Sequence, residues 1–152
     1  MTIAGLAEKR ELLPQVAALL HAEWGSLYPG AGIEERVKRL ESYLNLDRIP
    51  ITLVALDDGE LLGTASAIES DMASHPGWGP WLASVYVLPD RRGSGIGTAL
   101  VHEIAARSAS FGAKKLYLWT ERSEGLYARL GWETIAHEKY KGLDVGIMLK
   151  LL

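Results

Sequence analysis

A glycine-rich turn near the middle of the chain constrains its fold more than any other segment. The hydrophobic pattern predicts an apolar strand at residues 81–88 and a helix at 96–111, with Arg92-Gly93-Ser94-Gly95-Ile96-Gly97 at their junction. Glycines let backbone N–H groups approach a bulky anion, and the first N–H groups of a helix have no intrahelical partner. The helix dipole adds positive potential there. The turn is therefore predicted to hold a phosphate or pyrophosphate.

Two common phosphate-binding loops do not fit this turn. A Walker loop ends in Gly-Lys-Ser/Thr, whereas Thr98-Ala99 follows Gly97 here. A dinucleotide fingerprint needs Gly-x-Gly-x-x-Gly, and either way of counting puts Thr98 or Leu100 at the third glycine. A glycine-rich helix start that serves only close packing is the structural alternative to an anion site.

The remaining pattern predicts one α/β domain with a mixed sheet over residues 1–152. Asp57-Asp58-Gly59-Glu60 joins two apolar runs and predicts a β-hairpin. A strand–helix–strand crossover follows the hairpin and contains the glycine-rich turn. Strands are expected at residues 2–6, 51–56, 61–68, 81–88, 115–119, 132–137 and 145–151, and helices at 10–24, 33–44, 96–111 and 123–130.

Composition excludes several classes of function. The chain has no cysteine, which excludes disulfides, thiolate metal sites and a cysteine nucleophile and fits the reducing cytoplasm. Its net charge is −3 with scattered Lys and Arg, which argues against nucleic acid and suits a cationic substrate such as an amine. No segment has the pattern of a signal peptide or a membrane span, so no membrane partner is expected. The histidines show no spacing for a metal, and none is expected.

Two sequence blocks resemble the GNAT superfamily of N-acetyltransferases. Residues 84–100 resemble its signature, an apolar strand followed by Arg/Gln-x-x-Gly-x-Gly/Ala opening a helix, here with Arg92, Gly95 and Gly97. Residues 126–132 resemble the family's segment of a tyrosine on a short helix followed by Leu-Gly-aromatic. The blocks occur in the family's order and at its usual separation. The resemblance implies a GNAT-like α/β fold, with a mixed, mostly antiparallel twisted sheet of about six to seven strands and about four helices.

The resemblance also implies acetyl-CoA as co-substrate and direct transfer of its acetyl group to a primary amine of a small molecule, peptide or protein. The strand at 84–87 would splay from the one at 115–119, and the pantetheine arm would pair with the backbone of Val85 and Val87. A backbone N–H near Val87 would stabilise the oxyanion. The residues expected to bind the coenzyme are Val85, Tyr86, Val87, Arg92, Gly93, Ser94, Gly95, Ile96, Gly97 and Thr98.

Tyr127 matches the family tyrosine that hydrogen-bonds the coenzyme sulfur and acts as general acid. A phenol is protonated at neutral pH and can donate there. The alternative is a tyrosine whose ring only anchors a short helix. The flanking Leu130-Gly131-Trp132 favours the catalytic role.

The general base is not specified by the family pattern. Some relatives place a glutamate where this chain has Trp81, and the strand at 115–119 offers no carboxylate. A water relay through Ser84, without a dedicated base, is one alternative. The candidate side chains that remain are Glu69, Asp71, His75 and Glu121, and the sequence does not decide between them. Glu69 or Asp71, after the third strand, is the base that we consider first.

The acceptor side is expected to be aromatic, with Tyr28, Trp78 and Trp81 binding the substrate and Trp24 belonging to the core. No motif names the acceptor itself. The rival from another class is a non-catalytic acetyl-CoA-binding or interaction domain, and a third reading is a nucleotide-binding module. The exposed strands expected at residues 132–137 and 145–151 could pair with a second copy of the chain, which would form a homodimer.

Overall fold

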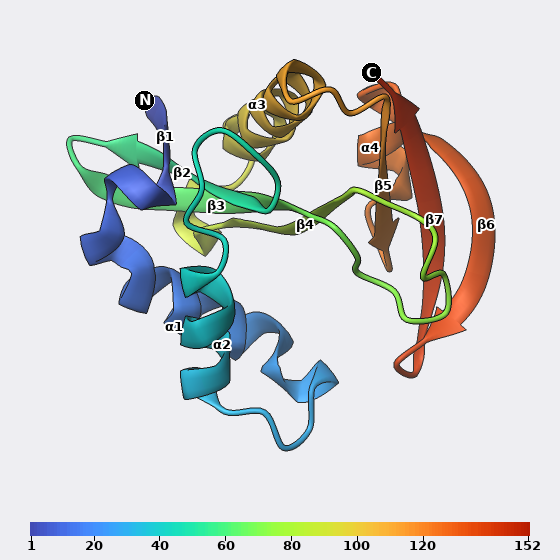
Figure 1. Cartoon of the computed structure of the whole chain (residues 1–152), viewed down its shortest axis with the longest axis horizontal. Coiled ribbons are helices and arrows are strands. Elements are labelled where there is room, and N and C mark those ends of the chain that lie inside the picture. The colour runs from blue at the N-terminus through green and yellow to red at the C-terminus, as the bar shows by residue number, and fades with distance from the viewer.

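Seven strands form one twisted sheet in the order β1-β2-β3-β4-β5-β7-β6 (Figure 1). The computed structural model describes all residues from 1 to 152. Every neighbouring pair of strands is antiparallel except β4 and β5, so the expected mixed, mostly antiparallel sheet is confirmed. The strands are β1 (Thr2–Gly5), β2 (Ile51–Asp57), β3 (Glu60–Ile68), β4 (Trp81–Val87), β5 (Lys115–Thr120), β6 (Glu133–Tyr140) and β7 (Leu143–Leu151).

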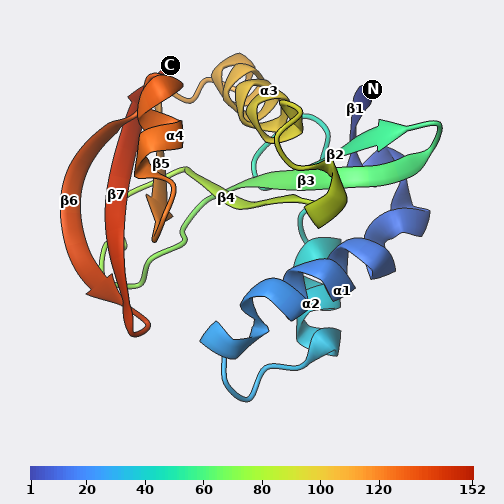
Figure 2. The same cartoon turned by 180° about the vertical axis from the view of Figure 1, so that it is seen from behind.

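Four α-helices flank this sheet. Helices α1 (Leu13–Trp24) and α2 (Ile33–Glu41) lie against one face of the β1–β4 half, and α3 (Ile96–Ser110) lies against the other face (Figures 1 and 2). The short α4 (Glu124–Arg129) follows β5 and contacts β6. The sheet is thus the middle layer of a helix–sheet–helix arrangement.

Strand β2 is apolar along almost its whole length because helices cover both of its faces. Successive side chains of a strand point to opposite faces. Leu53 and Ala55 accordingly belong to a core cluster with Leu100 of α3. Val54 and Leu56 belong to a second cluster, which α1 and α2 complete. This continuous apolar run therefore places the sheet between two hydrophobic cores.

A third core cluster lies where the two halves of the sheet meet. Trp81 of β4 and Tyr117 of β5 lie with their ring centroids 5.3 Å apart. Met72, from the connection between β3 and β4, and Ile147 of β7 are fully buried beside them. The connection thus packs over the C-terminal strands instead of standing out as an isolated loop.

Strands β4 and β5 pair at one position only, Trp81 opposite Tyr117. The Tyr117 N–H also donates to the carbonyl of Pro80 at 2.9 Å. Beyond this point the register between β3 and β4 shifts, and Ser84 has a φ of 56°, in the left-handed region typical of bulged backbone. The strands then diverge (Figures 1 and 2). The expected splay is confirmed, and a gap opens in the sheet.

Several element ends differ from the sequence prediction. The helix expected from residue 10 begins at Leu13, after a short 3-10 turn, and Pro14 lies in its first turn, where the missing N–H costs no bond. The second helix ends at Glu41, three residues early, because the backbone turns there. Strand β6 continues to Tyr140, three residues further than expected, because it pairs with β7 up to the tight turn.

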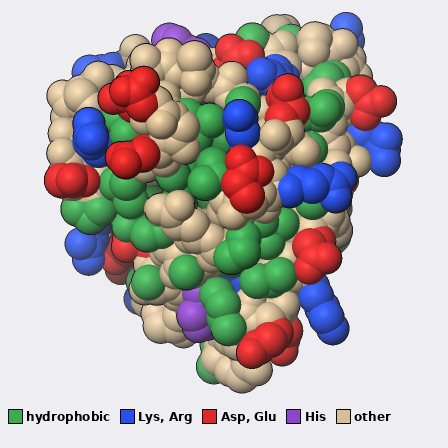
Figure 3. Space-filling view, turned by 90° about the vertical axis from the view of Figure 1, so that its left-hand side faces the viewer, with side chains coloured by type: hydrophobic (Ala, Val, Ile, Leu, Met, Phe, Trp, Pro, Cys, Tyr) green, Lys and Arg blue, Asp and Glu red, His purple; other side chains and the backbone are tan.

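The face that carries the β2–β3 hairpin shows acidic and basic side chains intermixed around apolar ones (Figure 3). No charge of one sign dominates this view.

None of the helices is both long enough and apolar enough to cross a membrane.

Candidate active site

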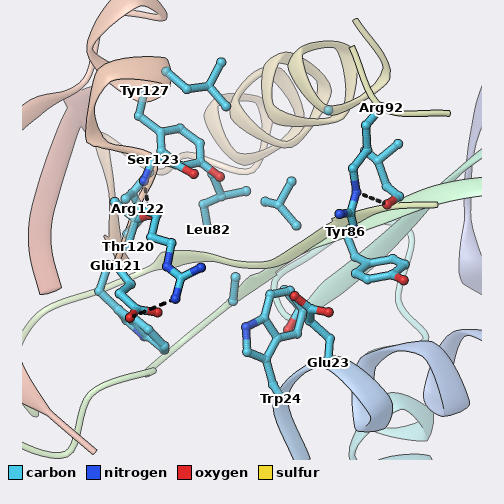
Figure 4. A pocket seen from close by; sticks show the side chains of 18 of the residues that line it. Glu23, Trp24, Leu82, Tyr86, Arg92, Thr120, Glu121, Arg122, Ser123 and Tyr127 are labelled. Carbon is cyan, nitrogen blue, oxygen red and sulfur yellow. Dashed lines mark hydrogen bonds and ion pairs between the residues drawn. The ribbon is translucent and has the colours of Figure 1, made fainter. Parts of the chain in front are cut away.

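A cavity of about 840 Å³ opens where β4 and β5 separate. One end is formed by β4 and the start of α3, and the other by the end of α1, the start of α2 and the first residue of β7. The end of β5 and helix α4 form the wall between them (Figure 4). The cavity thus joins the glycine-rich turn to the region between the two halves of the sheet.

The glycine-rich turn presents backbone donors to one end of this cavity. Gly93 and Gly95 have φ values of 81° and 87°, a conformation that side chains rarely adopt. Gly95 is the N-cap of α3, and the first backbone hydrogen bond of the helix runs from Ala99 to its carbonyl. The three N–H groups in between, of residues 96–98, therefore have no helical acceptor. This end can hold an anion, and the residues present fit a pyrophosphate.

Two side chains of the turn form hydrogen bonds to backbone carbonyls of the same segment. The Arg92 Nε donates to the carbonyl of Val87 at 2.9 Å, and the guanidinium lies 5.4 Å from the ring centre of Tyr86 (Figure 4). The Ser94 hydroxyl donates to the carbonyl of Arg91 at 2.7 Å. Ser94 is also the only one of the ten expected coenzyme-binding residues that does not line the cavity.

Strand β4 leaves backbone groups free along the gap. The Leu88 N–H donates to the carbonyl of Leu62 in β3 at 2.9 Å. Because donors alternate between the two edges of a strand, the N–H groups of Val85 and Val87 point to the other edge. No strand pairs with that edge after Trp81. An extended chain in the cavity could therefore bond to β4 as an additional strand would.

Tyr127 reaches the middle of the cavity from α4 (Figure 4). Its ring meets the Trp132 ring edge to face, with 6.1 Å between their centroids. The helix ends in a tight reversal, in which Gly131 has a φ of 92° and the Trp132 N–H donates to the Tyr127 carbonyl at 3.0 Å. Burial raises the Tyr127 pKa to about 12, and its hydroxyl has no hydrogen-bond partner in the chain. A protonated donor thus faces the cavity.

Asp71 is one of the carboxylates that line the cavity, and it lies at the far end. The Trp119 indole donates to its Oδ2 at 2.9 Å, and the Tyr140 hydroxyl donates to its backbone carbonyl at 3.1 Å. Burial raises the Asp71 pKa to about 6, while the Trp119 hydrogen bond and nearby Arg39 and Lys141 oppose this rise. This carboxylate can change protonation state near neutral pH.

The other candidates for the base lie in different surroundings. Glu69 is exposed and does not line the cavity. His75 pairs with Glu138 at 2.9 Å, also away from the cavity lining. Glu121 does line it, with a 3.7 Å ion pair to Arg122 (Figure 4). Ser84 lines it too, at the bulge of β4.

Two of the three aromatic residues expected at the acceptor wall lie outside the cavity lining. Trp81 is fully buried, because its large ring fills the core where β4 meets β5. Trp78 stacks on Tyr117 at 5.3 Å between ring centroids, and neither Trp78 nor Trp81 lines the cavity. The aromatic side chains that do line this end are Trp24, Tyr28 and Trp119, and Tyr86 lines the cavity from β4.

Sequence reasoning missed several residues of this end, including Glu23, Arg36 and Arg122. The position of Arg36 in the sequence could have marked it as a functional candidate. It stands three residues after Ile33 and four before Leu40, on the apolar stripe of α2, where a charged residue is unusual. Glu23 and Arg122 carry no comparable signal, because both belong to polar stretches at element ends.

A model of the acetyltransferase (GNAT) family matches residues 14–132, more than half of the chain. The chain belongs to this family. It therefore has the fold of an acetyl-CoA-dependent acyltransferase, and the family implied by the two sequence blocks is confirmed. The match contains both blocks, the glycine-rich turn and the segment that carries Tyr127.

Individual relatives agree with the family. Uncharacterized N-acetyltransferases of Mycobacterium tuberculosis and Mycobacterium bovis are 31% identical over 99 residues. These residues are 62% of this chain, which spans 60% of the length of each relative.

Solved structures of GNAT proteins share the whole fold. An aminoglycoside 6'-N-acetyltransferase complexed with coenzyme A has a TM-score of 0.78 at 22% identity, and the match covers 99% of this chain and 97% of that one. An aminoglycoside 6'-acetyltransferase type Ii has a TM-score of 0.75 at 26% identity, with the same coverage. A ribosomal-protein-alanine N-acetyltransferase from Brucella melitensis has a TM-score of 0.73 at 22% identity and is covered fully. Proteins named for different acceptors thus share this fold.

Proposed function

We propose that the protein transfers the acetyl group of acetyl-CoA to the primary amine of a small molecule while both substrates are bound. One observation carries the proposal: a single cavity joins an anion-binding helix start, an unpaired strand edge, a protonated phenol and a buried carboxylate. Each of these groups can serve one step of acetyl transfer from a thioester to an amine. The chain has no cysteine to carry the acetyl group in between, which supports direct transfer.

The start of α3 and the edge of β4 would bind the coenzyme. The free N–H groups of residues 96–98 would hold its pyrophosphate. The N–H groups of Val85 and Val87 would pair with the amides of the pantetheine arm, and the Val87 N–H would also lie near the thioester oxygen. Backbone donors held in fixed positions stabilise a developing oxyanion without reorganisation.

Tyr127 and Asp71 would handle the protons of the reaction. The neutral amine nitrogen attacks the thioester carbonyl carbon, the C–S bond breaks, and the departing sulfur takes the Tyr127 proton. As the amide forms, the nitrogen releases a further proton, and this proton, carried by water, restores the Tyr127 hydroxyl. The ammonium form of the acceptor gives its proton to Asp71, directly or through water. Deprotonating an amine with a pKa near 10 at pH 7 costs roughly 4 kcal/mol, so a nearby carboxylate assists this step.

Support for a small acceptor comes from the far end of the cavity and from the relatives. Trp24, Tyr28 and Trp119 line this end, and aromatic faces suit an alkyl amine or its cation. Two of the similar structures are named as aminoglycoside 6'-acetyltransferases, which act on small amines.

An amine screen tests this function. The protein is incubated with acetyl-CoA and a panel of diamines, amino acids, aminoglycosides and short peptides, while free coenzyme thiol is followed and products are weighed by mass spectrometry. We expect at least one small amine to give thiol release and a product heavier by one acetyl group. If acetyl-CoA binds and no amine raises thiol release above the amine-free control, the protein is a coenzyme-binding domain without turnover.

A further inference from the structure

Arg36 is a buried cation on the apolar side of α2. Its side chain and backbone together are only 8% exposed, and Leu40, one turn further along the same stripe, is 2% exposed. Arg36 nevertheless lines the acceptor end of the cavity. A charged side chain so deeply buried normally has an anionic partner or a set of hydrogen bonds.

The guanidinium of Arg36 has neither. No side-chain hydrogen bond and no ion pair joins it to any group of the chain. Its aromatic contact is with the ring of Tyr28, whose centre lies 5.7 Å from the guanidinium carbon. Burial lowers the Arg36 pKa, yet an arginine keeps its charge in proteins. Five N–H donors therefore lack protein acceptors beside the cavity.

Asp71 attracts Arg36 electrostatically but does not contact it. Its carboxylate accepts the Trp119 indole at 2.9 Å and makes no ion pair with Arg36. Two further cations face the same region, since Arg39 and Lys141 lie 5.2 and 4.5 Å from the centre of the Tyr28 ring. Arg36, Arg39 and Lys141 thus lie near the single carboxylate of Asp71. The other acidic side chains of the lining, Glu23 and Glu121, do not pair with Arg36.

We infer that the acceptor carries a carboxylate as well as its amine, and that Arg36 binds this carboxylate. The inference rests on the proposed acetyl transfer and narrows its substrate class to amino acids with a free carboxylate. A guanidinium presents a planar fork that matches a carboxylate with two parallel hydrogen bonds. Asp71 then attracts the ammonium group while Arg36 holds the opposite charge. Of Arg36, Arg39 and Lys141, only Arg36 lines this cavity, so the site offers one guanidinium to a single negative charge, and a polycation would leave it unpaired.

Matched acceptor pairs test the inference. Glycine, β-alanine, γ-aminobutyrate, alanine, phenylalanine and glutamate are each compared with the corresponding carboxamide, and ethanolamine phosphate with ethanolamine, by coenzyme thiol release. We expect at least one acid to exceed its carboxamide at least tenfold in kcat/KM. The phosphate pair separates a carboxylate site from a general anion site. A higher rate with ethanolamine phosphate than with every acid would replace the carboxylate by a phosphate and overturn the assignment.

Variants of Arg36 connect the preference to this side chain. Arg36→Met keeps the apolar stem and removes the charge, and Lys38→Met removes an exposed cation from the same helix as a matched control. We expect Arg36→Met to raise the KM for the preferred acid by roughly 10- to 100-fold, because charge-assisted hydrogen bonds are lost. The KM for acetyl-CoA and the rate with the carboxamide should change less than twofold. Arg36→Lys should recover part of the affinity, since it restores charge without the fork.

A second measurement does not depend on turnover. Binding of the N-acetylated acid and of its carboxamide is measured by calorimetry in the parent and in Arg36→Met. A tighter binding of the acid in the parent, lost in the variant, supports the inference. If carboxamides are acetylated as well as the acids throughout the panel, acetyl transfer stands and the carboxylate site is refuted. If no amine is acetylated and the acetylated acid binds no tighter than its carboxamide, both proposals fall.

Discussion

At the scale of single residues, the Tyr127 hydroxyl is the group whose removal tests the chemistry most directly. Tyr127→Phe keeps the ring that packs on Trp132 and deletes only the unpaired hydroxyl in the cavity. We expect kcat to fall roughly 100-fold, because a general acid typically contributes that much or more, with little change in the KM for acetyl-CoA. Tyr117→Phe removes a hydroxyl outside the cavity and should leave kcat unchanged. Equal kcat values for both variants would show that Tyr127 is not the acid.

Asp71 gives a prediction about pH. Its pKa of about 6 lies above the usual value for aspartate, and only the deprotonated carboxylate can accept a proton from the amine. Activity should therefore be lost as the pH falls through about 6, and kcat/KM should show an inflection there. Asp71→Asn should remove this inflection and lower the rate roughly 100-fold or more. Glu69→Gln, a neighbouring exposed carboxyl outside the cavity, is the control and should keep the parent profile.

The same raised pKa has the opposite effect on stability. A folded-state pKa of about 6, above the unfolded value of 3.8, means that stability is lost as the pH rises between these two values, and the loss is complete above about 6. Asp71→Asn should accordingly have a higher Tm than the parent at pH 8, with a smaller difference at pH 5. A lower Tm for the variant at both pH values would contradict burial as the cause of the shift.

Local spacing determined how much of the site could be predicted. Tyr127 was predicted as the general acid because Leu130-Gly131-Trp132, the reversal that ends its helix, lies beside it in the sequence. Asp71 and Glu69 are two residues apart and could not be separated, because the choice depends on contacts with Trp119, nearly fifty residues away. Long-range contacts of this kind leave no local pattern.

At the scale of elements, the start of α3 combines two glycines with opposite structural demands. Gly95 has a φ of 87°, so Gly95→Ala should lower the free energy of unfolding by about 1–2 kcal/mol. Gly97 lies inside the helix, and an added Cβ would meet Val87 Cγ2 at an ordinary 3.6 Å. Gly97→Ala should therefore raise the free energy of unfolding by about 1 kcal/mol.

Both alanine variants should nevertheless lower the affinity for the coenzyme, because each adds a methyl group to the cavity lining at the predicted pyrophosphate site. Urea unfolding gives the two stabilities, and calorimetry with coenzyme A gives the two affinities. Gly112→Ala, at another glycine with positive φ but outside the cavity, is the control and should cost stability without changing affinity. Unchanged affinity in both Gly95→Ala and Gly97→Ala would remove the pyrophosphate from this turn.

The elements themselves were predictable from hydrophobic period and turn residues, and their ends were not. The Asp-Gly pair gave the β2–β3 hairpin directly, with both strands within one residue of the prediction. Trp78 and Trp81 were expected at the acceptor site because they stand in or next to a polar stretch. In the structure this stretch packs against β5 and β7. A segment that is polar in sequence can still bury its aromatic rings when it crosses a sheet.

At the scale of the whole molecule, the sheet consists of two halves that share a single paired position. Strands β1–β4 and strands β5, β7 and β6 meet at Trp81 and Tyr117, and the cavity occupies the rest of their boundary. A coenzyme that bonds to the β4 edge would fill part of this boundary. Binding should thus stabilise the join between the halves as well as the folded state.

Coenzyme A should therefore protect the β4 edge from hydrogen exchange and raise Tm. At 100 times its Kd a ligand adds about 2.7 kcal/mol to the free energy of unfolding. The amides of Val85 and Val87 face the gap without partners and should exchange more slowly once the coenzyme pairs with them. The amides of Leu53 and Ala65, in the covered β2–β3 ladder, serve as internal reference. ATP at equal concentration should have neither effect. Similar stabilisation by ATP, with no added protection of Val85 or Val87, would assign the turn to a nucleotide and remove the pantetheine arm from the strand edge.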